Sequence, residues 1–516
     1  MNHWIIAPVV LPSLVAPLLV LVMRFDVRLQ RVFSFASAVA LLIIATALLH
    51  AASTAPPEVY RLGNWPAPFG IVLVLDRLSA LMVFLVALLS LPVLLYAAHG
   101  WDRRGRHFHA LFQFQLMGLT GAFLTGDLFN LFVFFEVLLI ASYGLMLHGA
   151  GAPRLKAGFQ YIVVNLAGSI LFLFAVGLIY SVTGTLNMAD LALKVPAVTA
   201  GDQAILKAGA LLLLVVFAIK AAVIPLHFWL PPTYGTASAP VAALFAIMTK
   251  VGAYSMIRVY TLIFGDAAGD LAAVAAPWLL PAALLTMVLG SLGVLAAGGL
   301  RAMACFALIA SMGVLLTGIG LFGEAATAAS LYYLAHTTLA SAALFLLADL
   351  LAERRGAAGD TLRLAPDMRQ GTLLAGLFLL IAVAMVGLPP LSGFIGKLLI
   401  LQQARGDMTV WVWGAILTTS LIQLVGFARV GSLLFWKSAT AREGAQTNPD
   451  SGERVAGAIL PLSAVILLVA MLALLTIFAG PASGIFEATA RQLFAPTAYI
   501  ETVLGGAQTQ GGLSPQ

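Results

Sequence analysis

Apolar stretches long enough to cross a membrane recur along almost the whole chain, with short polar connections between them. Of its 516 residues, 61% are hydrophobic and only 9% are charged, whereas a soluble domain carries about 25% charged residues. A helix of roughly 20 apolar residues spans the hydrocarbon core, and only helices and closed barrels satisfy their own backbone hydrogen bonds there. The sequence therefore predicts an all-α integral membrane protein.

The apolar stretches predict about fourteen transmembrane helices in a single polytopic membrane domain covering residues 1–516. The first stretch begins at Trp4 without a basic leader, so we expect a retained helix rather than a signal peptide. The expected helices lie near residues 4–23, 32–50, 78–98, 110–126, 128–147, 159–183, 206–223, 240–263, 271–296, 302–321, 326–348, 372–403, 409–435 and 455–480.

Most of the 27 Lys and Arg residues fall in the odd-numbered connections between these helices. Connections rich in Lys and Arg stay in the cytoplasm, which predicts that both termini lie on the outer side of the membrane. The net charge of +6 is then an orientation signal in a protein surrounded by lipid, and it requires no nucleic-acid partner.

Four charged residues lie within the apolar stretches: Glu136, Lys220, Lys250 and Lys397. An ionised group at this depth costs roughly 2.5–3.5 kcal/mol on insertion scales and usually marks an ion or proton path. The alternatives are a neutral glutamic acid satisfied by a neighbouring helix, and lysines that extend to the membrane surface. Lys250 lies too deep for that extension, so one acid and three bases favour a proton relay.

Two further residues are candidates for ion handling. His336 lies in the middle of a predicted helix and is either a core histidine or a relay group, because imidazole titrates near neutrality. Asp127 begins the fifth predicted helix at the outer surface and either caps that helix or contributes to a sodium access site. Arg258 and Asp349 are expected near helix ends, with Asp349 in solvent.

Two of the predicted helices contain breaks next to these lysines. Pro225, Pro231 and Pro232 follow Lys220, whereas Pro389 and Pro390 precede Lys397. Proline frees backbone carbonyls that lipid cannot satisfy, so such breaks survive only against protein or water. A pair of interrupted helices in two halves of a transporter is the usual sequence sign of its ion site. The two halves show no residue-level repeat.

Several other chemistries are excluded. The segment GFIGKLL has no hydroxyl residue after its lysine and therefore is not a phosphate-binding loop, so ATP is not the expected drive. The single cysteine, Cys305, excludes a disulfide framework and a cysteine-ligated iron–sulfur cluster within this chain. We expect no cofactor.

Three segments resemble a known family: GDLFNLFVFFEVLLIASYGLML, VVFAIKAAVIPLHFWLPPTYGTASAPVAALFAIMTKVGAYSMIRVYTLIFG and VGLPPLSGFIGKLLIL. They are similar to the antiporter-like subunits of respiratory complex I, and above all to the D-type subunit of the multisubunit Mrp (Mnh/Pha) Na+/H+ antiporters. The resemblance implies fourteen helices with two inverted five-helix repeats, at residues 110–263 and 271–435, and with the seventh and twelfth helices interrupted.

The resemblance also implies roles for the candidate residues. Glu136 and Lys220 match the family's Glu–Lys pair, in which each group keeps the other ionised. Lys250 and His336 match its central relay, and Lys397 matches the terminal basic residue of the second half. The sequence departs from some relatives at Ala340, where they carry a lysine, which leaves His336 as the link between the halves.

The function implied is that of a Na+/H+ antiporter subunit in a bacterial inner membrane. It would work only within a hetero-oligomer of Mrp subunits, driven by the membrane ion gradient. One alternative is a proton-pumping subunit of an NADH:quinone oxidoreductase or a membrane-bound hydrogenase, which the neighbouring genes would distinguish. Another is a scaffold without transport activity. The sequence does not reveal which cation is exchanged.

Overall fold

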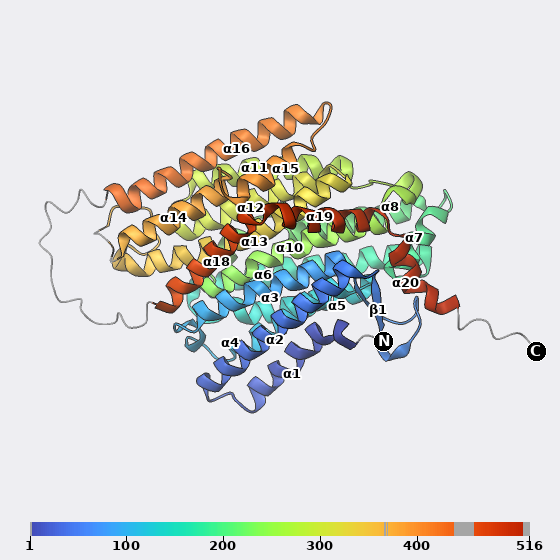
Figure 1. Cartoon of the computed structure of the whole chain (residues 1–516), viewed down its shortest axis with the longest axis horizontal. Coiled ribbons are helices and arrows are strands. Elements are labelled where there is room, and N and C mark those ends of the chain that lie inside the picture. The colour runs from blue at the N-terminus through green and yellow to red at the C-terminus, as the bar shows by residue number, and fades with distance from the viewer. Residues whose placement is uncertain (1–2, 366–367, 369, 438–458, 509–516) are drawn as a thin grey trace, which may run out of the picture.

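The computed structural model describes residues 3–365, 368, 370–437 and 459–508, and it is a bundle of long helices that run in similar directions (Figure 1). Within this part of the chain, eleven helices are long and apolar enough to cross a membrane, and three shorter apolar helices accompany them. The prediction of a helical, multi-pass membrane protein is confirmed at this level.

The helices follow the predicted apolar stretches, with ends that differ by a few residues. Residues 455–458, at the start of the last predicted helix, lie outside the described part of the chain. In chain order the helices of seven or more residues are α1 (Ala7–Leu21), α2 (Val27–Thr54), α3 (Arg77–Ala97), α4 (Phe108–Leu124), α5 (Leu128–Met146), α6 (Ala152–Thr183), α7 (Met188–Lys194), α8 (Gln203–Lys220), α9 (Leu230–Thr236), α10 (Ala239–Leu262), α11 (Ala276–Ala296), α12 (Leu300–Gly320), α13 (Glu324–Arg354), α14 (Gly371–Val386), α15 (Ser392–Leu401), α16 (Met408–Gly431), α18 (Ile459–Ile477), α19 (Ala479–Phe494) and α20 (Thr497–Gln508).

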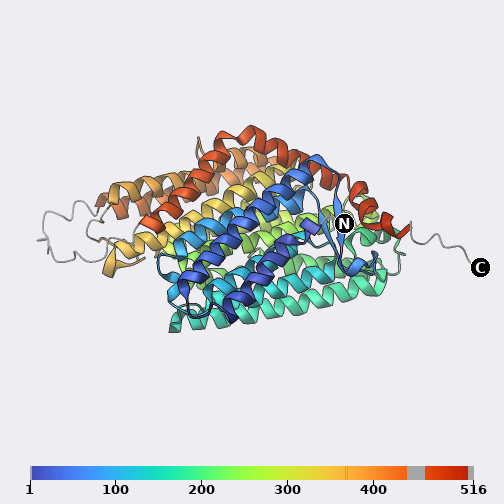
Figure 2. The same ribbon diagram turned by 60° about the horizontal axis from the view of Figure 1, so that its bottom comes forward.

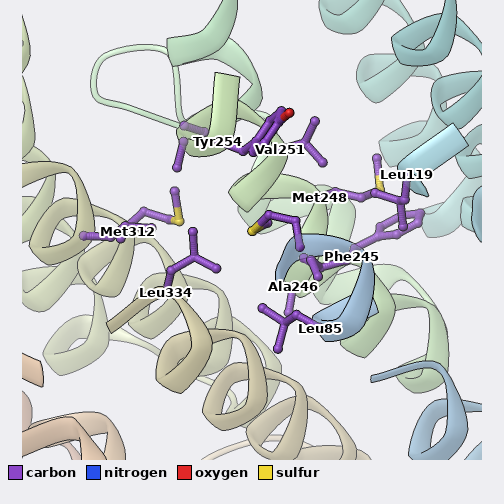
Figure 3. Packing of buried hydrophobic residues seen from close by; sticks show 14 of the residues in the cluster. Leu85, Leu119, Phe245, Ala246, Met248, Val251, Tyr254, Met312 and Leu334 are labelled. Carbon is purple, nitrogen blue, oxygen red and sulfur yellow. The ribbon is translucent and has the colours of Figure 1, made fainter. Parts of the chain in front are cut away.

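The core of the bundle is built around α10 and α13, which are buried along their most apolar segments. Figure 3 shows Met248 and Val251 of α10 among apolar side chains of the neighbouring helices, including Leu85 of α3 and Leu334 of α13. A helix surrounded by other helices on every side has no lipid contact. Polar groups within these buried segments of α10 and α13 therefore face protein.

The Lys- and Arg-rich connections, which have odd numbers in the order of the predicted helices, meet at one end of the bundle. Asp349, in the last turns of α13, accepts hydrogen bonds from Tyr96, Trp101 and Arg301, and it is only 6% exposed. The expectation that Asp349 is solvated is therefore wrong, because the neighbouring connections close over it. Nearby, burial opposes ionisation of Asp102, but hydrogen bonds from Arg31 and His109 lower its pKa to about 2.

The opposite end of the bundle carries both described ends of the chain and a small hairpin (Figure 1). The hairpin pairs β1 (Glu58–Arg61) with β2 (Val72–Leu75) in antiparallel register. Beside it, Arg258 of α10 forms a buried bidentate ion pair with Asp76, the cap of α3, at 2.6 and 2.8 Å. As expected, Arg258 thus lies near the end of its helix, and its partner there is the Asp76 carboxylate.

The C-terminal helices α18 and α19 lie along the outside of the bundle, where the red ribbon is seen in Figures 1 and 2. Both helices pack against α13, and α20 then packs against α7 and β1. Neither α19 nor α20 was predicted from the sequence, because neither contains an apolar stretch of spanning length.

Candidate functional site

Glu136 lies in the middle of α5, and its carboxylate accepts a hydrogen bond from the Ser169 hydroxyl of α6. It is only partly buried in the chain alone. The residues one turn to either side, Val133 and Ile140, are 38% and 65% exposed. The carboxylate therefore lies at a side of the bundle that is open in the isolated chain.

Lys220 is the last residue of α8 and is only 7% exposed. Its Nζ donates a hydrogen bond of 2.9 Å to Asn165 Oδ1 of α6 and lies 5.8 Å from the ring centre of Phe135. The alternative in which Lys220 extends to the membrane surface does not hold, because its amine points into the bundle.

Glu136 and Lys220 are connected through α6 rather than bonded to each other. Within the described residues, no ion pair of 4.0 Å or less joins the two side chains. The Ser169 hydroxyl binds Glu136 and shares its one proton with the Asn165 backbone carbonyl 3.1 Å away, whereas the Asn165 side chain binds Lys220. Two polar side chains one turn apart on α6 thus lie between the acid and the base.

A small cavity of about 10 Å³ adjoins Lys220 and is lined by Met248 and Val251 on the α10 side. This volume matches the space that one water molecule needs. Lys250 is on the same helix but does not line this cavity; it is 0% exposed and has no hydrogen-bond partner for Nζ among the described residues. A buried ionisable group without a protein partner is a candidate for a functional role.

His336 of α13 is 1% exposed, and its Nδ1 lies 2.9 Å from the hydroxyl of Ser392, the first residue of α15. A Cβ atom at Gly393 would clash with the Ala384 carbonyl and lie 2.9 Å from His336 Nε2. Only glycine therefore allows α15 to approach α13 this closely. His336 contacts the second helix break directly.

Lys397 of α15 is 4% exposed and points back into the break between α14 and α15. Its Nζ donates to the Val386 carbonyl at 2.7 Å and to the Ser420 hydroxyl of α16 at 2.9 Å. Gly387 ends α14 with a φ of 80°, and a Cβ atom there would lie 2.7 Å from the lysine chain. The surface-extended alternative is therefore wrong for Lys397 as well.

Both helix breaks are satisfied by protein groups, as a break at membrane depth requires. In the first break, Trp229 Nε1 donates to the Ile219 carbonyl, and Ile224 donates its backbone N–H to Thr286 of α11, each at 3.0 Å. In the second, Lys397 itself binds the carbonyl that α14 leaves free. The predicted interruptions are thus present, one next to each lysine.

Asp127 caps α5, because its Oδ1 accepts the Asn130 N–H at 2.9 Å. Burial raises the pKa of this carboxyl group. Among the described residues, no group of three or more His, Cys, Asp or Glu side chains is arranged to hold a metal ion. The capping interpretation is confirmed, and sodium access through Asp127 stays a prediction.

Sequence reasoning did not identify the polar partners of the charged residues: Asn165, Ser169, Ser392 and Ser420. One of these partners could have been recognised in the sequence, because Asn165 is the only asparagine in the long apolar helix α6. Buried polar side chains almost always have a hydrogen-bond partner. A polar residue inside an apolar stretch is therefore a second sign of the path.

A membrane bundle with buried bases beside two interrupted helices belongs to the class of ion-translocating proteins. Residues 125–423 match the protein family described as NADH:quinone oxidoreductase/Mrp antiporter, TM, and the chain belongs to this family.

Individual relatives support this family assignment. The chain is 41% identical to the D-type subunit of a probable K+/H+ antiporter of Rhizobium meliloti, covering 98% of both chains. It is 36% identical to the D-type subunit of a Na+/H+ antiporter of Alkalihalophilus pseudofirmus, covering 98% of this chain and 100% of that one. Its fold is similar to a chain of the Mrp complex from Dietzia sp. DQ12-45-1b, with a TM-score of 0.87, 29% identity, and coverage of 98% of this chain and 100% of that chain.

Proposed function

We propose that this chain is the D-type subunit of a multisubunit Mrp antiporter, which exchanges a monovalent cation such as Na+ for protons. The observation that carries the proposal is the placement of Lys220 and Lys397, each buried at the break of an interrupted helix. The drive is the ion gradient across the membrane, with no cofactor in this chain. Relatives named for Na+ and for K+ both support cation exchange.

The bundle supports a proposal of fourteen membrane crossings, with α8–α9 and α14–α15 each counted as one interrupted helix. Residues 110–263 and 271–435 then form two five-helix units, related by an inverted repeat. The fourth helix of each unit is interrupted and carries a buried lysine, before the break at Lys220 and after it at Lys397. We further propose that both termini lie outside a bacterial plasma membrane, which the Lys- and Arg-rich odd-numbered connections support.

In this mechanism a proton passes from one base to the next, and each base alternates between its neutral and its charged form. The ammonium of Lys220 is held by a neutral amide, and Glu136 stabilises it through the polar contacts of α6. When Glu136 is neutralised by a proton or a cation, Lys220 releases its proton. A water molecule in the cavity beside Lys220 then passes that proton toward α10, the helix that carries Lys250. His336 and Lys397 carry protons onward to the second break.

Partner subunits are part of the proposal because Glu136 lies at an open side of the bundle. A carboxylate at mid-membrane is costly against lipid. The exposed apolar residues around it, Val133 and Ile140, are suited to contact another membrane protein. Other Mrp subunits would cover this side, in agreement with the similarity to a chain of the Mrp complex.

A respiratory proton pump is the second candidate, because the matched family description includes NADH:quinone oxidoreductase. The two functions differ in their drive. An antiporter exchanges cations for protons in membranes that receive no redox substrate, whereas a respiratory pump requires electron transfer.

The test is cation-induced proton movement in everted vesicles from an antiporter-deficient host that expresses the whole complex. Replacing Glu136 or Lys220 with alanine should abolish this movement while the purified complex keeps all its subunits. Lys194→Ala changes a lysine whose side chain is 45% exposed and serves as the matched control. Exchange at the wild-type rate in E136A or K220A would contradict the assignment. Exchange that appears only with an electron donor would favour the respiratory pump.

A further inference from the structure

A groove of about 650 Å³ lies between α14 and α16, and none of the candidate site residues lines it. We call it the α14–α16 groove. Most of its lining is apolar, and its walls include Leu379, Val383, Leu424 and Phe427. Leu379 is 61% exposed, so the groove opens at the side of the bundle. At membrane depth this side faces hydrocarbon or an apolar partner.

One end of the groove lies at the basic end of the bundle. There it is lined by Gly371, at the start of α14, and by Trp436, which is 73% exposed. Lys437 follows Trp436 in the sequence, and Arg354 reaches Gln370, the residue before Gly371, at 3.5 Å. No side chain caps α14, so the partial positive charge of its N-terminus adds to that of the two cations.

The other end of the groove lies at the second helix break. It is lined by Val386 and Leu388, and the Val386 carbonyl is the group that binds Lys397. An apolar occupant of the groove would therefore cover the outside of this break and keep water away from it.

The size of the groove decides between the possible occupants. A spanning helix about 30 Å long and 10 Å wide fills more than about 2,000 Å³, which is well beyond the groove. A groove of several hundred cubic ångströms is in the size range of pockets for small, mostly apolar ligands, so it can hold an acyl chain. Basic pockets between transmembrane helices bind anionic lipid headgroups, and tryptophan is enriched at the same depth.

We propose that the α14–α16 groove binds a membrane phospholipid with an anionic headgroup. The acyl chain lies along the apolar lining as far as Val386, and the phosphate lies at the mouth beside Arg354, Lys437 and the N-terminus of α14. This binding site does not depend on which ion the protein transports, because none of the transport residues touches the lipid.

The test uses the whole complex in nanodiscs that contain a trace of phospholipid with a photoreactive group in its acyl chain. Labelled phosphatidylglycerol is compared with labelled phosphatidylcholine, and adducts are mapped by mass spectrometry. Adducts on α14 and α16 are normalised to those on the exposed face of α6. Phosphatidylglycerol should label the groove about tenfold more than phosphatidylcholine, because each nearby cation favours the anionic headgroup.

Two sets of variants test the contacts. Gly376→Phe fills the groove, since a side chain at Gly376 meets no atom within 4 Å. Gly414→Phe makes the same change at an open position of α16 outside the groove lining and is the control. The pair Arg354→Gln and Lys437→Gln removes the charges at the mouth, with Arg103→Gln and Arg106→Gln as a control of equal charge.

The proposal requires groove labelling to fall in G376F but not in G414F, and the preference for phosphatidylglycerol to fall only in the R354Q/K437Q pair. Labelling no stronger than that of α6, for either lipid, would overturn it. So would the absence of any lipid adduct in the groove, which would mean that a partner subunit covers it. If G376F does not assemble, the charge variants alone decide the question.

Discussion

The buried amines of Lys220 and Lys397 are both held by neutral oxygen atoms. Lys220 binds the amide oxygen of Asn165, whereas Lys397 binds the Val386 carbonyl and the Ser420 hydroxyl. A hydrogen bond with one ionised partner is roughly twice as strong as a neutral one, and a carboxylate acceptor would add the attraction of an opposite charge. Neutral acceptors therefore position each amine without binding its proton so tightly that transfer stops.

Asn165→Leu should slow cation-dependent proton exchange, because it removes the acceptor that positions Lys220. A hydrogen bond to a charged group contributes about 1.5–3 kcal/mol, so the rate should fall roughly ten- to hundredfold. The pH profile of exchange should shift as well, since a purely structural role would leave the profile in place. The measurement is the initial rate of exchange against pH in everted vesicles.

Ser181→Ala is the control for this prediction, because Ser181 is an exposed residue of α6 that bonds only within its own helix. Ser169→Ala, which removes the donor to Glu136, should behave like the Asn165 variant. An unchanged pH profile in N165L would show that Asn165 does not position the proton-carrying amine.

The depth of the charged residues was predictable from the sequence, but their partners were not. Counting residues from the ends of an apolar stretch places Lys250 at mid-membrane, and it is indeed fully buried. The same counting placed Asp349 in solvent, where the structure buries it beneath Trp101 and Arg301. Position along a helix says nothing about which neighbouring connection folds over its end.

At the level of elements, the two interrupted helices were the most predictable feature. Proline cannot donate a backbone hydrogen bond, so the clustered prolines around Pro225 and Pro389 favour a break, whereas the single Pro92 lies inside the continuous helix α3. What closes each break was not predictable, because Trp229 and Lys397 act through contacts that depend on the local fold. The helices α19 and α20 were missed because they are short and amphipathic rather than apolar throughout.

Arg258→Leu should strongly destabilise the contact between α10 and α3, because it leaves Asp76 buried without its partner. Removing one member of a buried ion pair costs about 3–5 kcal/mol. The measurement is the melting temperature of the purified complex. The control is Arg405→Leu, a change at an exposed arginine in the connection between α15 and α16.

The double variant Asp76→Asn and Arg258→Leu should recover part of the lost stability, since it removes both charges together. Equal melting temperatures for R258L and R405L would show that the ion pair does not join the two helices.

For the whole molecule, the C-terminal segment joins parts of the chain that are far apart in sequence. The α18 and α19 helices pack on α13 and α3, and α20 ends beside α7 and the hairpin strand β1. A hydropathy reading finds the spanning helices one at a time and gives no information on such long-range packing. The arrangement in Figures 1 and 2 therefore had to come from the structure.

Tyr499 of α20 is buried against the bundle, and we expect it to hold this segment in place. It is 4% exposed, and its ring centre lies 5.4 Å from the guanidinium of Arg258. Its hydroxyl would lie 3.2 Å from a Cβ atom at Gly126, just before α5, and it has no hydrogen-bond partner among the described residues. The aromatic ring, rather than the hydroxyl, should therefore provide the stabilisation.

Tyr499→Ala should then cost about 3–5 kcal/mol of stability, as the loss of a large buried ring does, whereas Tyr499→Phe should cost little. Hydrogen exchange followed by mass spectrometry on the intact complex would measure this locally, with faster exchange in residues 497–505 of Y499A and unchanged exchange in Y499F. Equal protection in both variants would mean that other contacts of α20 hold the segment. Faster exchange in Y499F would instead assign the stabilisation to the hydroxyl group.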